Sequence, residues 1–176
     1  MLYVSNITDI DDKLIKKGQE DGTTMQEVAR KFEAEYIKDS EGLNVKAPTV
    51  RPRATEHIGE IIKIVKALVE SGHAYVAHTG DVYFRVKSDP GYGKLSHLNL
   101  DDLESGNREL RSQMDDDLKE DPADFAVWKA AKPGEPSWNS PWGQGRPGWH
   151  IECSAMARTH LGKTIDLHAG GPDLIF

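Results

Sequence analysis

The sequence predicts an α/β fold, on the evidence of three patterns along its 176 residues. Short apolar runs stand near both ends, at residues 2–5 and 164–168, and each predicts a buried strand beside a helical pattern. The middle of the chain combines a strong helical stripe with alternating residues around a turn. We therefore expect the two end segments to share one sheet, with a mixed segment inserted between them.

Two helices are predicted after the first strand. Three aspartates open residues 9–18, and the dipole of a helix favours negative charge at its N-terminus. Thr24 and Glu27 have the spacing of a capping box and predict the start of a second helix. Its apolar face holds side chains at four-residue spacing: Val28, Phe32 and Tyr36. The two prolines within residues 47–55 then predict a linker.

The middle of the chain predicts one long helix and a hairpin. Isoleucine, valine and leucine hold one helical stripe over residues 58–69, and Gly72 ends it. Residues 73–86 alternate around a Thr-Gly-Asp turn, which is typical of a β-hairpin. Residues 124–131 predict a strand, and residues 133–147, rich in proline and glycine, predict a loop. A helix is expected over residues 149–161, ended by glycine.

Net charge and composition exclude several classes of protein. The charge is −7, with 29 acids against 22 bases, whereas binding to phosphates needs clustered lysine and arginine. Ten of the acids fall within residues 101–124, which predicts a solvated acidic face or loop. No uncharged apolar run approaches the roughly 18 residues of a membrane span, and the N-terminus lacks a secretory pattern. Together with the single cysteine, these features predict a cytoplasmic protein.

The only cysteine, Cys153, has several interpretations from the residues alone. A lone intracellular thiol is often a small buried hydrophobic group. Here Trp149 precedes it by four positions on the predicted helix, so the two side chains share a face. A place in the first turns of a helix lowers the pKa of a thiol toward the thiolate form, which binds zinc. Cys153 is therefore filler, a ligand of a metal or substrate, or a nucleophile.

Two further segments stand where a predicted strand ends. Thr8 follows the first strand, and its plain alternative is a helix N-cap. His168 ends the last strand and is followed by Gly170, Gly171 and Asp173. Open α/β sheets bind ligands at this edge, and glycine lets the backbone approach a ligand closely. The plain alternative for the second segment is a surface turn.

Three blocks together resemble the cysteinyl-tRNA synthetase family of class I aminoacyl-tRNA synthetases. They are NITDIDDK at residues 6–13, GRPGWHIECSAM at 145–156 and IDLHAGGPDLIF at 165–176. Residues 51–58, 80–86 and 138–145 resemble the connective-peptide insert of the same family, so the resemblance covers the whole chain. It implies a Rossmann-like catalytic domain in two pieces, 1–46 and 148–176, interrupted by a mixed α/β insert at 47–147.

The resemblance also implies a reaction and a zinc ion. The family activates cysteine with ATP to cysteinyl adenylate and transfers it to tRNA(Cys). Zinc in the amino-acid pocket binds the substrate thiolate, which separates cysteine from serine because zinc prefers a soft thiolate to a hydroxyl. Matched residue by residue, Cys153 is a zinc ligand, and Thr8, Trp149 and His168 belong to the cysteine pocket.

The glycine-rich turn is implied to hold the ribose of the adenylate through Gly170, Gly171 and Asp173. This chain departs from the family there, with Ala169 in place of a third glycine and Pro172 in place of a small polar residue. Proline has no N–H, so it cannot donate a backbone hydrogen bond to the ligand.

Several blocks of the family would lie before Met1 or after Phe176, among them the nucleotide signature and the remaining zinc ligands. We therefore expect an internal fragment that is inactive alone and binds zinc and tRNA weakly. His57-Ile58-Gly59-Glu60 is similar to the His-Ile-Gly-His signature but lacks its second histidine, so we interpret it as ordinary helix surface. Two alternatives stay open: the ligase that couples cysteine to an amino sugar in mycothiol synthesis, and a non-catalytic binding module.

Overall fold

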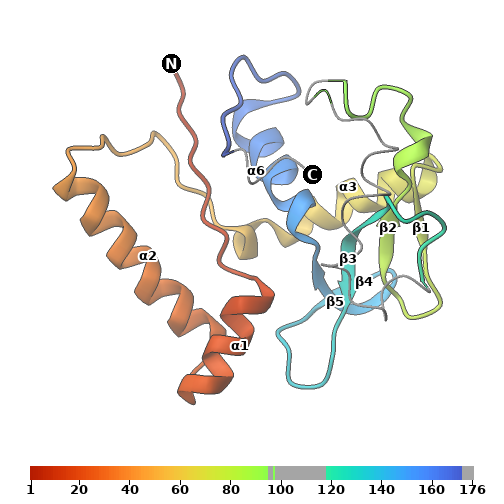
Figure 1. Cartoon of the computed structure of the whole chain (residues 1–176), viewed down its shortest axis with the longest axis horizontal. Coiled ribbons are helices and arrows are strands. Elements are labelled where there is room, and N and C mark those ends of the chain that lie inside the picture. The colour runs from red at the N-terminus through yellow and green to blue at the C-terminus, as the bar shows by residue number, and fades with distance from the viewer. Residues whose placement is uncertain (95–96, 98–117, 172–176) are drawn as a thin grey trace.

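The computed structural model describes residues 1–94, 97 and 118–171. In chain order the helices and strands are α1 (Asp12–Asp21), α2 (Met25–Gly42), the 3-10 helix η1 (Ala54–His57), α3 (Ile58–Glu70), β1 (Ala74–Val76), β2 (Val82–Phe84), the 3-10 helix η2 (Val86–Ser88), β3 (Phe125–Ala130), β4 (Trp138–Ser140), β5 (Gly143–Pro147) and α6 (Trp149–Leu161). Figure 1 shows α1 and α2 on one side of α6 and the sheet on the other. Helices and a sheet in one mixed architecture confirm the predicted α/β class. None of the described helices is long and apolar enough to span a bilayer.

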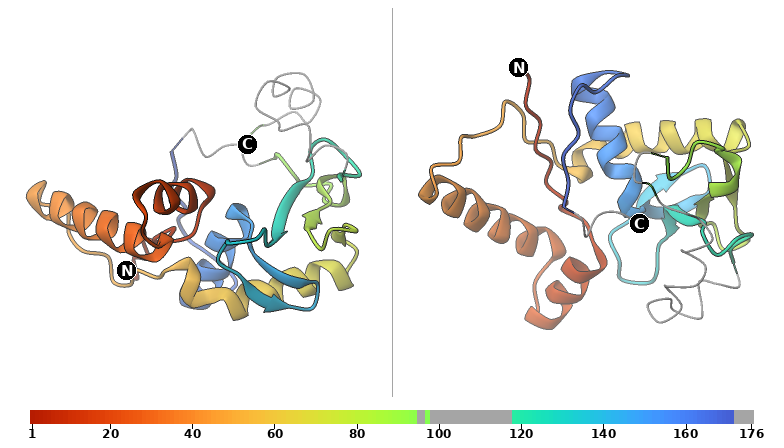
Figure 2. Two further views of the ribbon diagram at one scale, coloured as in Figure 1. Left: turned by 90° about the horizontal axis from the view of Figure 1, so that it is seen from below. Right: turned by 45° about the horizontal axis from the view of Figure 1, so that its top comes forward.

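The sheet has five strands in the order β1-β2-β3-β5-β4, and every neighbouring pair is antiparallel. The predicted hairpin is β1–β2, closed by a hydrogen bond of 2.8 Å from Ala77 N to Asp81 O. Gly80 adopts a φ of 92° in this turn, a conformation that glycine adopts without strain. Figure 2 shows α3 running along one face of the sheet. One hydrophobic cluster joins α3, the sheet and α6, with members that include Ile61, Val82, Trp128 and Ala155.

Most predicted helices are confirmed. The capping box of Thr24 and Glu27 is present at α2, and α6 has the predicted bounds. The predicted stripe of α3 is buried at Ile58, Ile61 and Val65. On α2, however, the outer aromatic residues Phe32 and Tyr36 are 46% and 47% exposed, so only the first turns of its predicted apolar face are covered.

The first helix extends beyond its predicted end. Gly18 lies inside α1, and a Cβ built on it would stand 3.0 Å from Met25 N. The glycine thus permits a close approach of α1 to the start of α2 and does not end the helix. Gly22, with a φ of 64°, provides the end.

The strand predicted at residues 2–5 is wrong in its extent. Among the described residues, this segment pairs through one isolated parallel bridge, Val4 with Val50, and a second bridge joins Ile7 with Arg53 just beyond it. Its partner is the predicted linker, which carries Pro48 and Pro52. Proline has no N–H, so a continuous ladder cannot form along this pair.

Two other predictions near the C-terminus are wrong. Residues 133–147 are not a loop throughout, because β4 and β5 form a hairpin there, with a φ of 110° at Gly143. Residues 164–168 form no strand and are exposed. A strand needs neighbours for its backbone N–H and C=O groups, and within the described residues no strand or bridge pairs with this segment. The expected shared parallel sheet is therefore not formed in this chain.

The two end segments nevertheless pack together, as expected. A second hydrophobic cluster brings Ile10, Ile15 and Met25 against Met156 of α6. The same helix buries Ile151 and Ala155 in the cluster with the sheet. Helix α6 therefore contacts both halves of the molecule, and the domain boundaries at residues 47 and 148 stay predictions.

Candidate functional site

The start of α6 is held close against β3 by a glycine. Gly148 is the N-cap of α6, and its N–H donates to Val127 O at 3.0 Å. A Cβ at this position would lie 2.0 Å from Ala126 O, far inside van der Waals contact. Only glycine lets β5 pass directly into α6 at this distance, and this junction places Trp149 in the first turn.

Trp149 and Cys153 lie one turn apart on α6, on the same side of the helix. Trp149 is 40% exposed, and Cys153 is exposed as well, so the interpretation of the thiol as buried filler does not hold for this structure. The expected shift of the thiol is wrong in direction: local desolvation and then the charge of Glu152 raise the pKa of Cys153. Desolvation thus outweighs the effect of the helix N-terminus on the pKa of this thiol.

Glu152, next to Cys153, points the other way, into the protein. It is 1% exposed, and its Oε2 atom has no hydrogen-bond partner among the residues that the structure describes. Burial first, and then the negative charges of Asp9 and Asp11, raise the pKa of Glu152 to about 9, partly offset by Arg146. The loop that follows Thr8 therefore runs beside the first turn of α6. The burial of Glu152 was not predicted from the sequence.

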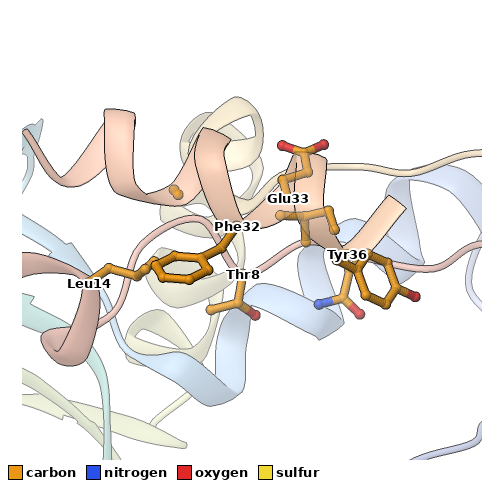
Figure 3. A pocket seen from close by; sticks show the side chains of 8 residues that line it. Thr8, Leu14, Phe32, Glu33 and Tyr36 are labelled. Carbon is orange, nitrogen blue, oxygen red and sulfur yellow. The ribbon is translucent and has the colours of Figure 1, made fainter. Parts of the chain in front are cut away.

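Thr8 lines a cavity of about 370 Å³ between the N-terminal segment and α2. Figure 3 shows Thr8 together with Leu14, Phe32, Glu33 and Tyr36 around this cavity. Glu33 is held by Arg53, which donates from Nε and Nη2 to its two oxygens, both at 2.8 Å. The cavity is open to solvent and has an apolar and aromatic wall with a few polar groups.

The segment after α6 is irregular over residues 162–171 and exposed over residues 162–170. His168 and Gly170 are exposed and Gly171 is partly exposed, all outside any helix or strand. Asp173, the predicted ribose ligand, lies outside the described residues. Asp9 and Asp11, which follow Thr8, act on the buried Glu152, so the Thr8 loop lies near the inward side of α6 and not near the side that exposes Trp149 and Cys153.

A buried arginine joins β5 to the start of α1 and to the loop before β4 through ion pairs. Arg146 of β5 has a side chain that is 6% exposed, and it pairs with Asp12 at the start of α1 and with Glu135 at 3.2 Å. Lys129 of β3 also reaches Asp12, at 3.1 Å. Burial alone would raise the pKa of Asp12, but Lys129 and Arg146 outweigh it and hold the pKa below its usual value. The acids predicted to favour the start of α1 thus also tie α1 to the sheet, and Asp11 is the N-cap.

Two polar contacts fix the entry to α3. Asp9 is 8% exposed and accepts from Thr55 N at 2.9 Å and from Thr55 Oγ1. His57 is the N-cap of α3 and contacts His160, so this part of the signature-like tetrapeptide is a helix start and not ordinary helix surface. Sequence patterns carry no signal for either contact, since 46 and 103 positions separate the partners.

The described residues supply only part of the ligand set that a zinc site needs. Among the residues that the structure describes, no group of three histidine, cysteine, aspartate or glutamate side chains is placed to hold a metal ion. Cys153 can offer one exposed sulfur, whereas a protein zinc site needs three or four ligands.

Comparison with known proteins places these features in context. Residues 1–176 match the family described as tRNA synthetases class I (C) catalytic domain. The chain is 54% identical over 176 residues to a cysteine–tRNA ligase of Caldicellulosiruptor saccharolyticus, covering 100% of this chain and 37% of that protein. It is 56% identical over 174 residues to the cysteine–tRNA ligase of Limosilactobacillus reuteri, covering 99% and 37%. The chain thus spans 37% of the length of these relatives.

Proposed function

The chain belongs to the catalytic-domain family of class I (C) tRNA synthetases, and on that premise we propose that the protein carrying it activates cysteine with ATP and transfers it to tRNA(Cys). The observation that carries the proposal is the identity of 54% and 56%, along essentially the whole chain, to two cysteine–tRNA ligases. A cytoplasmic location, and weak tRNA binding by this acidic chain alone, stay predictions.

We assign roles to individual residues within this proposal. Trp149 and Cys153 share an accessible face at the start of α6, and Thr8 lines a cavity beside α2. We assign these three residues to the cysteine-binding part of the site because they match the cysteine-pocket and zinc-binding positions of the family. By the same match to the family, we assign His168 to that pocket and Gly170, Gly171 and Asp173 to the ribose of the adenylate. Cys153 would supply one ligand to a zinc ion, and such an ion would favour the thiolate of cysteine over a hydroxyl group.

Cysteine-dependent ATP–pyrophosphate exchange by the longer protein that carries this chain tests the proposal. Cys153→Ser is expected to lower kcat/KM for cysteine by at least about 100-fold, because a zinc ligand is lost. The matched control is Ser154→Ala, a change at the adjacent exposed residue, which is expected to leave exchange unchanged. Circular dichroism verifies that both variants fold. Full exchange in Cys153→Ser would contradict the assigned role of the thiol.

This chain by itself is expected to bind zinc weakly through Cys153, because the described residues offer no complete ligand set. Zinc titration in competition with a chromophoric chelator measures the affinity, with Cys153→Ser as the reference. Tight stoichiometric uptake that disappears in Cys153→Ser would show that the chain supplies further ligands around the thiol. The same preparation is expected to give no ATP–pyrophosphate exchange above background.

The cysteine–amino-sugar ligase is the second candidate, because it would use the same zinc and cysteine groups. Substrate choice separates the two functions: the proposed enzyme consumes tRNA(Cys) after adenylation, whereas the ligase would consume an amino sugar. A non-catalytic module predicts that neither acceptor is used and that exchange is absent in the longer protein.

A further inference from the structure

Two histidines meet between the start of α3 and the last turn of α6. The Nε2 atoms of His57 and His160 are 3.0 Å apart, and their ring centroids are 5.1 Å apart. Both residues are partly exposed, so solvent and ions can reach them. His160 lies seven residues beyond Cys153, about 10 Å along the helix axis, which is too far for one ion to bind both.

The hydrogen bonding of His57 fixes which nitrogen is free. Its Nδ1 lies 2.7 Å from the carbonyl oxygen of Arg53, and a carbonyl can only accept, so Nδ1 carries the hydrogen and donates it. Neutral His57 therefore directs the lone pair of Nε2 toward His160. A metal-binding histidine usually has one ring N–H held by a backbone carbonyl and a lone pair on its other nitrogen, as His57 has here.

The spacing of the rings also suits a shared ion. Imidazole nitrogen binds zinc at about 2.0–2.1 Å, so two imidazoles on one tetrahedral ion have ring centroids about 5 Å apart. The observed separation of 5.1 Å agrees with this value. Two nitrogens on one tetrahedral ion lie about 3.3 Å apart, so the rings have to turn toward the ion and their Nε2 atoms have to separate slightly from the observed 3.0 Å. His160 then gives up the hydrogen on Nε2 and carries one on Nδ1, so the net charge of the pair is unchanged.

We propose that His57 and His160 together bind one divalent transition-metal ion of the class that imidazole prefers, namely Zn²⁺, Ni²⁺ or Cu²⁺. Water fills the remaining positions, because no third ligating side chain joins the pair among the described residues. The ion ties η1 to the end of α6, two segments that already pack together. This site is independent of Cys153 and of the proposed reaction.

Titration of the tag-free chain with Ni²⁺ by calorimetry tests the site, in a Cys153→Ser background that removes the thiol. We expect saturable uptake of one ion, weakened about tenfold or more by either His57→Gln or His160→Gln. The control is His78→Gln, a change at an exposed histidine of the β1–β2 turn, which is expected to leave the affinity unchanged.

Thermal unfolding provides a second measurement, because an ion that binds only the folded pair raises the melting temperature. Ni²⁺ is expected to raise the melting temperature of the background and of His78→Gln, and EDTA is expected to reverse the rise. His160→Gln is expected to show no such rise, and it decides the matter if His57→Gln does not fold. Absence of saturable uptake, or equal affinity in His160→Gln and the background, would show that the pair is only a hydrogen-bonded packing contact.

Discussion

Gly148→Ala is expected to lower the free energy of unfolding by about 3 kcal/mol or more, which is large for a single added methyl group. The new Cβ would lie 2.0 Å from Ala126 O and 2.7 Å from the carbonyl carbon of the same residue. Both are backbone atoms of β3, so no side chain can turn aside to make room. Either β5 separates from β3 or α6 shifts, and in both cases the position of Trp149 and Cys153 changes.

Urea unfolding followed by tryptophan fluorescence measures this loss. Gly59→Ala is the matched control, since Gly59 lies in α3 with nothing within 4 Å of the added Cβ. Alanine there is expected to stabilise the chain by about 0.5–1 kcal/mol, because glycine is the poorer helix former. Equal stability of Gly148→Ala and the unchanged chain would mean that the β5–α6 junction is looser than its geometry indicates.

Arg146→Met is expected to cost about 2–3 kcal/mol of unfolding free energy. Methionine fills most of the volume but leaves the Glu135 carboxylate, whose side chain is 13% exposed, without its buried cation. The estimate is below that for a fully buried pair because the other partner, Asp12, is 61% exposed. Lys129→Met serves as the control: Lys129 is 37% exposed and reaches only Asp12 among the ion pairs of the described residues, so a loss of about 1 kcal/mol or less is expected.

The double variant Arg146→Met with Glu135→Gln distinguishes loss of the ion pair from loss of packing. Replacing the Glu135 carboxylate, which has lost its partner in Arg146→Met, is expected to recover part of the stability, because Arg146 and Glu135 are in direct contact. If the double variant is no more stable than Arg146→Met, the arginine acts through packing of its stem.

Acid titration tests the ion pairs of Asp12 with Arg146 and Lys129 independently. The lowered pKa of Asp12 means that its ionised form stabilises the folded chain at pH values above the usual 3.8. That contribution is lost as the pH falls below 3.8 and through the folded-state pKa of Asp12. Asp12→Asn is expected to flatten the stability profile in this acidic window and to leave its shape near neutral pH unchanged.

Local patterns were sufficient where the neighbours of a segment lie close in sequence. The capping box of Thr24 and Glu27, the stripe of α3 and the β1–β2 hairpin depend on contacts within a few residues, and all three are confirmed. Failures occur where the outcome depends on distant partners. Residues 133–147 look like a loop because of their prolines and glycines, yet β5 is a strand through its pairing with β3.

The same holds for the candidate site: features set by nearby residues were predicted, and features set by distant residues were not. Sequence spacing correctly placed Trp149 and Cys153 on one face of a helix. It did not reveal that Glu152 is buried, although Met156, four residues later on the same helix, is buried too and gives the one local signal. The direction of the pKa shift at Cys153 depends on desolvation and on Glu152, and the position of a thiol in a helix does not determine either.

Helix α6 contributes residues to both hydrophobic clusters, and this determines how the chain unfolds. Ile151 and Ala155 belong to one hydrophobic cluster and Met156 to the other, so neither cluster survives if this helix dissociates. The catalytic segments and the insert, which the family resemblance separates, then form one cooperative unit of unfolding. A single transition is expected in hydrogen exchange and in denaturant, with the slowest-exchanging amides in α6 and in β3, the strand on which it rests.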